Sequence, residues 1–200
     1  MDLAQTDDNT AVAMVTVDDA GVFHAKVWGI LPKDRVEIKS TKEDVDYKKL
    51  IAAGNCFAEG EEVIDYGFVE RWILGLEEKY GVEIMQIGYD RYNAISTVQK
   101  LEAAGYECVE VKQHSSVLHP PTKLLREAIL KREFAYEDNR LLEINFQNAR
   151  CTEDTNLNKY VNKKRSAGKV DMVMAIIDAM YLLQVDMLSN TELIWGIQVI

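Results

Sequence analysis

The stretch AVAMVTVDDAGVFHAKVWGI, residues 11–30, indicates the fold class. Its first seven residues, 11–17, are apolar or β-branched and predict a buried strand, and the DDAG sequence at residues 18–21 is a turn signal. Residues 22–30 predict the antiparallel partner of that strand. We therefore expect a β-hairpin to open the sheet.

Further along the chain, helical and strand patterns alternate. Residues 82–89, VEIMQIGY, predict a strand, residues 94–104 a helix and residues 106–111 a half-buried strand. Strands separated by helices pair in parallel, whereas the hairpin is antiparallel. The strongest helix is expected at residues 169–188. The sequence thus predicts an α/β domain whose mixed sheet has helices on both faces.

Composition limits the class of protein. The 200 residues are 48% apolar and 28% charged, which is typical of a packed soluble domain. We expect one domain over residues 1–200, with an insertion at 31–62 and a basic loop at 151–168. No stretch of about 18 uncharged apolar residues predicts a membrane span, and Cys56, Cys108 and Cys151 lack zinc-ligand spacing. The net charge of −10 argues against broad non-specific binding of nucleic acid.

Three aspartates occupy positions that are costly for acids. Asp2 precedes the first strand, Asp90 ends the apolar strand 82–89, and Asp171 lies in the first turn of the apolar helix. Each has an ordinary alternative interpretation: a terminal residue, a solvated loop acid, or an acid that favours the helix dipole. Brought together at one end of a sheet, three carboxylates would repel one another, and divalent cations relieve that repulsion. Two such ions about 4 Å apart can activate water against a phosphodiester, which is the chemistry of a nuclease.

The order of several short motifs resembles a known family. The motifs are Asp2-Leu3-Ala4 with Asp8-Asn9-Thr10-Ala11, then residues 62–66 (EVIDY), 87–94 (IGYDRYNA) and 145–149 (NFQNA), then Asn158-Lys159, and finally Lys169-Val170-Asp171 with Ala175 and Ala179. This ordered set resembles the nuclease domain of the large terminase subunits of tailed bacteriophages. Each motif is weak by itself, and the set runs over nearly the whole chain.

The resemblance implies an RNase H-like fold and a metal-dependent endonuclease that cuts concatemeric viral DNA during packaging. Carried over by position, Asp2, Asp90 and Asp171 would be the catalytic, metal-binding acids, with two Mg²⁺ or Mn²⁺ ions as cofactors. Asp8 matches a further acid of the opening motif and could bind metal, orient water or cap a turn. Implied partners are double-stranded DNA, the small terminase subunit and the portal, in the host cytoplasm and transiently at the procapsid, with no membrane partner.

The chain also departs from that family. It has no G-x-x-x-x-G-K-[ST] phosphate loop, so the ATPase half is absent. In the family, the first acid lies on a central strand that begins several residues earlier, whereas here only Met1 precedes Asp2. We therefore expect this sequence to be a nuclease domain excised from a longer chain.

A basic segment precedes Asp171. Between Thr155 and Val170 there is no acid, and the basic residues are Lys159, Lys163, Lys164, Arg165 and Lys169. Such a segment could hold DNA phosphates beside the acids, or it could be a solvated loop. Two other functions stay open: another nuclease of the RNase H superfamily, such as a junction resolvase or transposase-like enzyme, and a catalytically inactive acidic docking module.

Overall fold

The expected hairpin forms the centre of the fold. The computed structural model describes residues 1–4 and 9–195 of the chain. Strands β1 (Thr10–Val17) and β2 (Phe23–Leu31) pair antiparallel, with Thr10 opposite Ile30 and Val17 opposite Phe23. In the turn between them the carboxylate of Asp18 accepts hydrogen bonds from the amides of Ala20 and Val22. This part of the prediction is confirmed.

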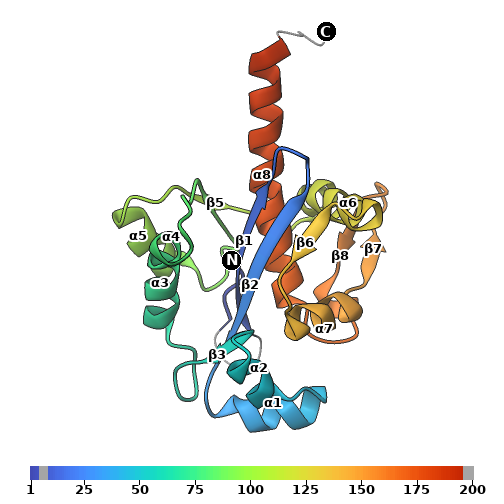
Figure 1. Cartoon of the computed structure of the whole chain (residues 1–200). Helices are drawn as coiled ribbons and strands as arrows, with labels where there is room; N and C mark the ends of the chain where they lie inside the picture. Colours follow the sequence, from blue (N-terminus) through green and yellow to red (C-terminus); the bar gives the residue numbers. More distant parts are fainter. Residues whose placement is uncertain (5–8, 196–200) are drawn as a thin grey trace.

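Two short strands extend the hairpin into a mixed sheet (Figure 1). Strands β3 (Cys56–Ala58) and β6 (Phe134–Tyr136) both pair parallel to β2, at its opposite ends. Helices α1 (Arg35–Glu43) and α2 (Tyr47–Ala52) connect β2 to β3. The segment 31–62, expected to be an insertion, therefore also adds a strand to the sheet.

A separate parallel pair lies beside the main sheet. Strand β4 (Ile87–Tyr89) pairs with β5 (Cys108–Glu110), and helix α5 (Ile95–Ala103) connects them. Helices α3 (Tyr66–Leu74) and α4 (Leu76–Tyr80) precede this pair. The strand expected at 82–89 is reduced to its last three residues, because no strand of the described residues pairs with the part before Ile87 and the Ile84 amide bonds to the Glu77 side chain instead.

The first three residues join the two sheets. Asp2 pairs with Ala11 of β1 through two backbone hydrogen bonds of 3.0 and 2.8 Å. On the other side, the amino group of Met1 donates to the carbonyl of Gly88, and the Asp90 amide donates to the carbonyl of Met1 at 3.4 Å. Residues 1–3 therefore lie between β1 and β4 as a short strand segment that bonds to both.

Helices cover both faces of the hairpin. On one face, helix α8 (Asp171–Trp195) packs on β1 and buries the side chains of Met172, Ile176, Ile177 and Met180 completely or nearly so. The other face packs Val12, Trp28 and Ile30 against α3 and α4. Along β1 and β2, alternate residues belong to the core on the α8 side and to the core on the α3–α4 side. This alternation is expected of strands that are buried on both faces.

Helices α6 (Ser115–Lys131) and α7 (Arg140–Asn148) pack against α8. The hairpin of strands β7 (Cys151–Glu153) and β8 (Lys159–Val161) packs against α6, ahead of the 3₁₀ helix η1 (Lys163–Arg165). Residues 151–168 are therefore an antiparallel hairpin and a helical turn rather than the expected loop. The reason is a turn that its residues encode: the Asp154 carboxylate accepts hydrogen bonds from the amides of Asn156 and Asn158 and closes the hairpin.

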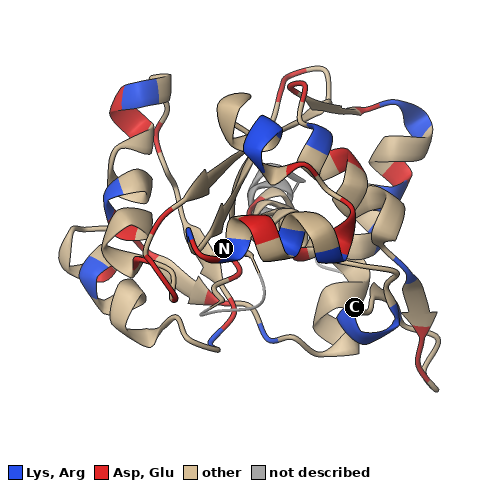
Figure 2. Cartoon of the chain, turned by 90° about the horizontal axis from the view of Figure 1, so that it is seen from below, with Lys and Arg blue, Asp and Glu red and all other residues tan. Residues whose placement is uncertain are grey.

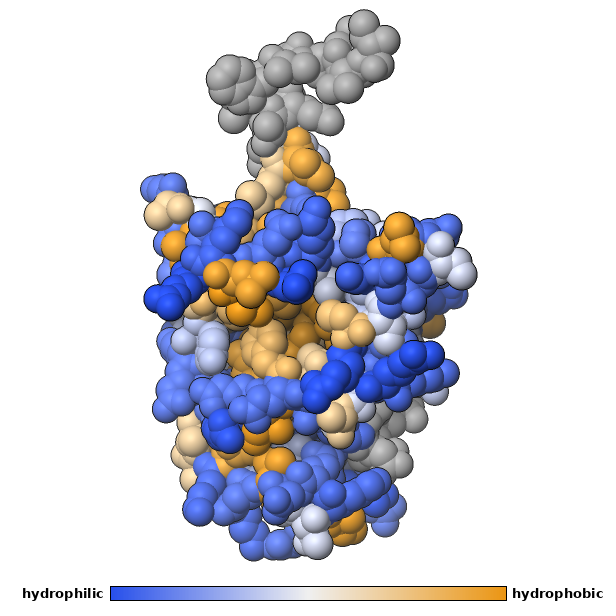
Figure 3. Space-filling model, turned by 90° about the vertical axis from the view of Figure 1, so that its right-hand side faces the viewer, coloured by the Kyte–Doolittle hydropathy of each residue, from blue (hydrophilic) through white to orange (hydrophobic). Residues whose placement is uncertain are grey.

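The end of α8 projects beyond the body of the protein (Figure 1), and Figure 3 shows apolar residues on the projecting part. Val185 and Leu188 are 47% and 61% exposed there. Within the described residues, Asp171–Ser189 of α8 is long and apolar enough to cross a membrane, but half of this window is buried inside the protein. A core helix of a soluble protein passes the same test.

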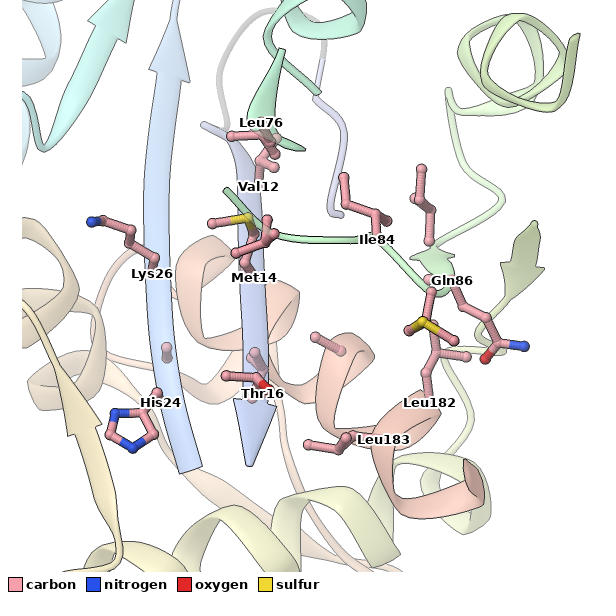
Figure 4. A pocket seen from close by; sticks show the side chains of 18 of the residues that line it. Val12, Met14, Thr16, His24, Lys26, Leu76, Ile84, Gln86, Leu182 and Leu183 are labelled. Carbon is pink, nitrogen blue, oxygen red and sulfur yellow. The ribbon is translucent and has the colours of Figure 1, made fainter. Parts of the chain in front are cut away.

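A groove with a volume of about 960 Å³ lies between β1 and the segment that leads into β4, next to Met1. Val12, Met14 and Thr16 of β1 line one side, and Ile84 and Gln86, which precede β4, line the other (Figure 4). Leu182 and Leu183 of α8 also point into it. Most of the lining is apolar, and it lies next to the buried start of the chain.

The closest approach of β4 to α8 depends on a glycine. A Cβ on Gly88 would lie 3.1 Å from a Leu182 methyl carbon and 3.2 Å from the Asp178 carbonyl oxygen. We expect Gly88→Ala to lower the free energy of unfolding by about 1–3 kcal/mol, because helix backbone cannot move aside. As a control, Gly75→Ala, in helical conformation between α3 and α4, should be neutral or stabilising by up to about 1 kcal/mol. Urea unfolding measures both changes, and a Gly88→Ala protein as stable as the wild type would contradict this packing.

Candidate active site

Two of the three expected acids share one cation. Asp2 and Asp171 are only 7% and 3% exposed. The ammonium of Lys163 bonds to Oδ2 of Asp2 and lies 3.6 Å from Oδ1 of Asp171. Residues far apart in the chain meet here because Asp2 pairs with β1, Asp171 begins α8, and Lys163 lies on η1.

Asp90 lies next to the segment that carries Asp2. Its amide bonds to the carbonyl of Met1, and its carboxylate accepts a hydrogen bond of 3.2 Å from the Tyr92 amide. Burial raises the pKa of the Asp2 carboxyl, Lys163 opposes that effect, and the negative charge of Asp90 contributes to the rise. The structure therefore places Asp171 beside Asp2 through their shared lysine, and Asp90 near Asp2.

The three carboxylates do not form a complete set of metal ligands in this structure. Within residues 1–4 and 9–195, no group of three or more His, Cys, Asp or Glu side chains is close enough together to hold one ion. The donor chemistry nevertheless fits, because buried carboxylates need a positive charge and carboxylate oxygens are the ligands that Mg²⁺ prefers. Asp2 and Asp171 already enclose a cation, and Asp90 is adjacent. Asp8, the further candidate, lies outside the described residues.

Two asparagines that the sequence analysis did not assign hold Asp171 and its helix turn in place. The Asn9 amide donates to Oδ2 of Asp171 at 3.3 Å, and the Asn9 side chain donates to the hydroxyl of the buried Tyr47. The side chain of Asn145 accepts from the Met172 amide and donates to the Leu141 carbonyl, which fixes the first turn of α8. Asn9 and Asn145 belong to quoted motifs, but their bonding partners are distant in sequence.

The basic residues expected to bind DNA separate into different surroundings. Lys163 contacts the buried acids, and Lys159 pairs with Glu153 at 3.2 Å across the β7–β8 hairpin. Lys164 and Arg165 are exposed on η1, and Lys169 is partly buried. In the view from below, basic and acidic residues are interspersed over the elements rather than gathered in one basic patch (Figure 2).

Asp178 is a further buried acid, two turns after Asp171 on α8. It is 1% exposed, and its Oδ1 accepts a hydrogen bond of 3.0 Å from the side chain of Gln113. Its Oδ2 has no hydrogen-bond partner among the described residues. Burial raises the pKa of this carboxyl to about 7, and the charges of Asp2 and Asp90 add to the rise.

A family model and a solved structure are similar to this chain. The family model described as "Terminase large subunit, endonuclease domain" matches residues 1–186. The crystal structure of the large terminase of bacteriophage HK97 is similar, with a TM-score of 0.81 and 19% sequence identity. That match covers 88% of this chain but only 37% of the HK97 chain. It shows an RNase H-like terminase nuclease fold.

A second solved structure gives a partial match. The large terminase nuclease of the thermophilic phage G20c matches with a TM-score of 0.46 and 19% identity, over 57% of this chain and 61% of that one. A search of curated proteins finds no significant match.

The raised pKa of Asp178 predicts a pH dependence of stability. A carboxyl that is harder to ionise in the folded state stabilises the protein fully below the unfolded pKa of 3.8, and this contribution is lost as pH rises to about 7. We expect the free energy of unfolding of the wild type to fall relative to that of Asp178→Asn between about pH 4 and pH 7. Denaturant unfolding at several pH values measures this difference, and a constant difference would contradict the buried, neutral carboxyl.

Proposed function

Because the chain belongs to the family of terminase large subunit endonuclease domains, we propose that it hydrolyses phosphodiester bonds of concatemeric double-stranded viral DNA, with Mg²⁺ or Mn²⁺ as cofactor. The observation that carries this proposal is the buried pair of Asp2 and Asp171 around one cation, with Asp90 beside it. Buried carboxylates of this kind are costly unless a positive charge compensates them.

We assign the metal-binding role to Asp2, Asp90 and Asp171. When bound, two divalent ions would supply a metal-activated water and charge stabilisation for the leaving oxygen. Asp2 is held by backbone bonds to β1, and Asp171 by the Asn9 amide and the anchored first turn of α8. These bonds keep the carboxylates in position before any ion or DNA arrives, which lowers the cost of organising the site.

The two cysteines with the most strongly raised thiol pKa values do not favour covalent catalysis by a thiolate. Burial raises the pKa of the Cys56 thiol to about 12 and that of Cys108 to about 11, so both thiols are protonated at neutral pH. A nucleophilic water is therefore the better proposal, and it would leave a 3′-hydroxyl and a 5′-phosphate.

DNA contact is proposed for Lys159, Lys163, Lys164, Arg165 and Lys169. Lys164 and Arg165 are exposed on η1, beside the Lys163 that reaches the acids. The net charge of −10 predicts that this domain alone binds DNA weakly and with strong salt dependence. An ATPase domain, the small terminase subunit and the portal would hold DNA in place, in the host cytoplasm and at the procapsid.

We also propose that the chain is one domain of a longer protein. It covers little more than a third of the HK97 chain. By the alternation of an antiparallel ladder, the backbone groups of Ala13 and Val15 point, like those of Ala11, away from β2 and into the groove. A strand leading into Met1 would pair with them, and its side chains would meet apolar residues on both faces.

Plasmid nicking in Mn²⁺ tests the assignment of the acids. We expect Asp90→Asn and Asp171→Asn each to lower the cleavage rate by about 10²-fold or more, because each removes a proposed metal ligand. Asp19→Asn, an exposed acid in the β1–β2 turn, is the control and should cut like the wild type. Full cutting by both site variants would refute the assignment, and a preference for branched over linear DNA would favour a junction resolvase. A wild type that does not cut, alone or within the longer protein, would favour an inactive docking module.

Extending the chain before Met1 tests the groove as the place of a strand. We expect about six added β-branched apolar residues to raise the melting temperature by about 2–4 °C or more, because they would pair with β1 and bury apolar surface. The control extension has the same length but carries proline at alternate positions, which cannot complete the ladder. Calorimetry on the three proteins makes the comparison, and equal melting of the two extended proteins would contradict the proposal.

A further inference from the structure

Lys163 is the side chain that links the two buried acids, and its backbone is held independently of them. The side chain of Asn162 accepts hydrogen bonds from the amides of Lys164 and Arg165 at 3.0 and 3.3 Å, which fixes η1. The Asn162 amide donates to the Arg150 carbonyl at 2.9 Å. The turn is thus tied to the start of the β7–β8 hairpin, and only the flexible side chain of Lys163 crosses to the acids.

Exposure differs sharply across this contact. The side chain of Lys163 is 39% exposed, whereas those of Asp2 and Asp171 are 9% and 5% exposed. The ammonium therefore reaches the carboxylates from the solvent side. Rotation about the bonds of its four-carbon chain can return it to water while the turn stays in place.

The ammonium contacts carboxylate oxygens that a divalent ion at this site would also bind. It bonds to an oxygen of Asp2 and lies 3.6 Å from an oxygen of Asp171. A Mg²⁺ ion bound to carboxylate oxygens lies about 2 Å from each of them. Two cations cannot share so small a volume, because they would overlap and repel each other.

We propose that Lys163 is a built-in counter-cation that keeps Asp2 and Asp171 paired in the metal-free protein and competes with the divalent ion for them. Lys163 is in this sense a positioning residue that sets the metal affinity of the site. This inference rests on the metal-dependent function proposed above. It gives Lys163 a role different from that of its exposed neighbours Lys164 and Arg165.

Calorimetric titration with Mn²⁺ alone, together with thermal melting, tests the proposal. We expect Lys163→Gln to bind Mn²⁺ about tenfold more tightly than the wild type, because the competing charge is gone. Without metal it should melt at a lower temperature, since the two acids lose their counter-charge, and Mn²⁺ should raise its melting temperature more than that of the wild type. Lys131→Gln, the same charge change on the exposed end of α6, should behave like the wild type.

The outcomes separate the two proposals. If the wild type binds Mn²⁺ in a manner that Asp171→Asn abolishes, but Lys163→Gln binds it no more tightly, the metal site stands and the role of Lys163 is refuted. If neither protein shows Mn²⁺ binding that Asp171→Asn removes, both proposals fail.

A second measurement on the wild type does not depend on the folding of a variant. The NMR signal of the Lys163 ε-methylene group should move toward the position of exposed lysines as Mg²⁺ saturates the site. A signal that stays unchanged with Mg²⁺ bound would overturn the proposal.

Discussion

Burial of Asp2 and Asp171 beside each other is the constraint on which the site depends. Two carboxylates removed from water repel each other and lose hydration, so the fold must supply positive charge between them. In this structure Lys163, a half-exposed side chain on a short 3₁₀ turn, contacts both acids, and the buried Lys39 adds positive charge near Asp171. The hydrogen bonds that Asn9 and Asn145 make around Asp171 hold that carboxylate and its helix turn in place. An arrangement of this kind is costly for stability alone, which is why we interpret it as a cation site.

The scaffold brings these groups together through three elements that meet at one point. Residues 1–3 lie between β1 and β4 and bond to both, so that Asp2 and Asp90 become neighbours. Helix α8 packs across β1 and begins at Asp171. The absence of a side chain at Gly88 lets β4 approach α8 closely. The apolar groove next to Met1 lies between the same two elements, β1 and the segment leading into β4. The packing of these elements therefore determines both the position of Asp2 and the position of the groove.

Elements with strong local patterns could be predicted from the sequence, and elements defined by distant partners could not. The hairpin of residues 11–30 and the helix that begins near Asp171 were predictable because their apolar periodicity and turn residues are local. The strand at 82–89 is shorter than its pattern suggests, since pairing depends on a neighbour that reaches only residues 87–89. Prolines such as Pro120-Pro121 favour the start of a helix, yet helix α6 begins before them at Ser115, where the His114 side chain caps its first turn. The candidate acids were assigned from their order along the chain. The bonds from Asn9 to Asp171, from Met172 to Asn145 and from Lys163 to Asp2 could not be predicted, because they join residues 162, 27 and 161 positions apart.

A crystal of the protein soaked in Mn²⁺ tests the central claim most directly, by the anomalous scattering of the metal. We predict anomalous density between the carboxylates of Asp2 and Asp171, with Asp90 turned toward it and the Lys163 ammonium displaced toward solvent. Mn²⁺ bound only at other surfaces, with Lys163 still joining the two aspartates at saturating metal, would contradict it.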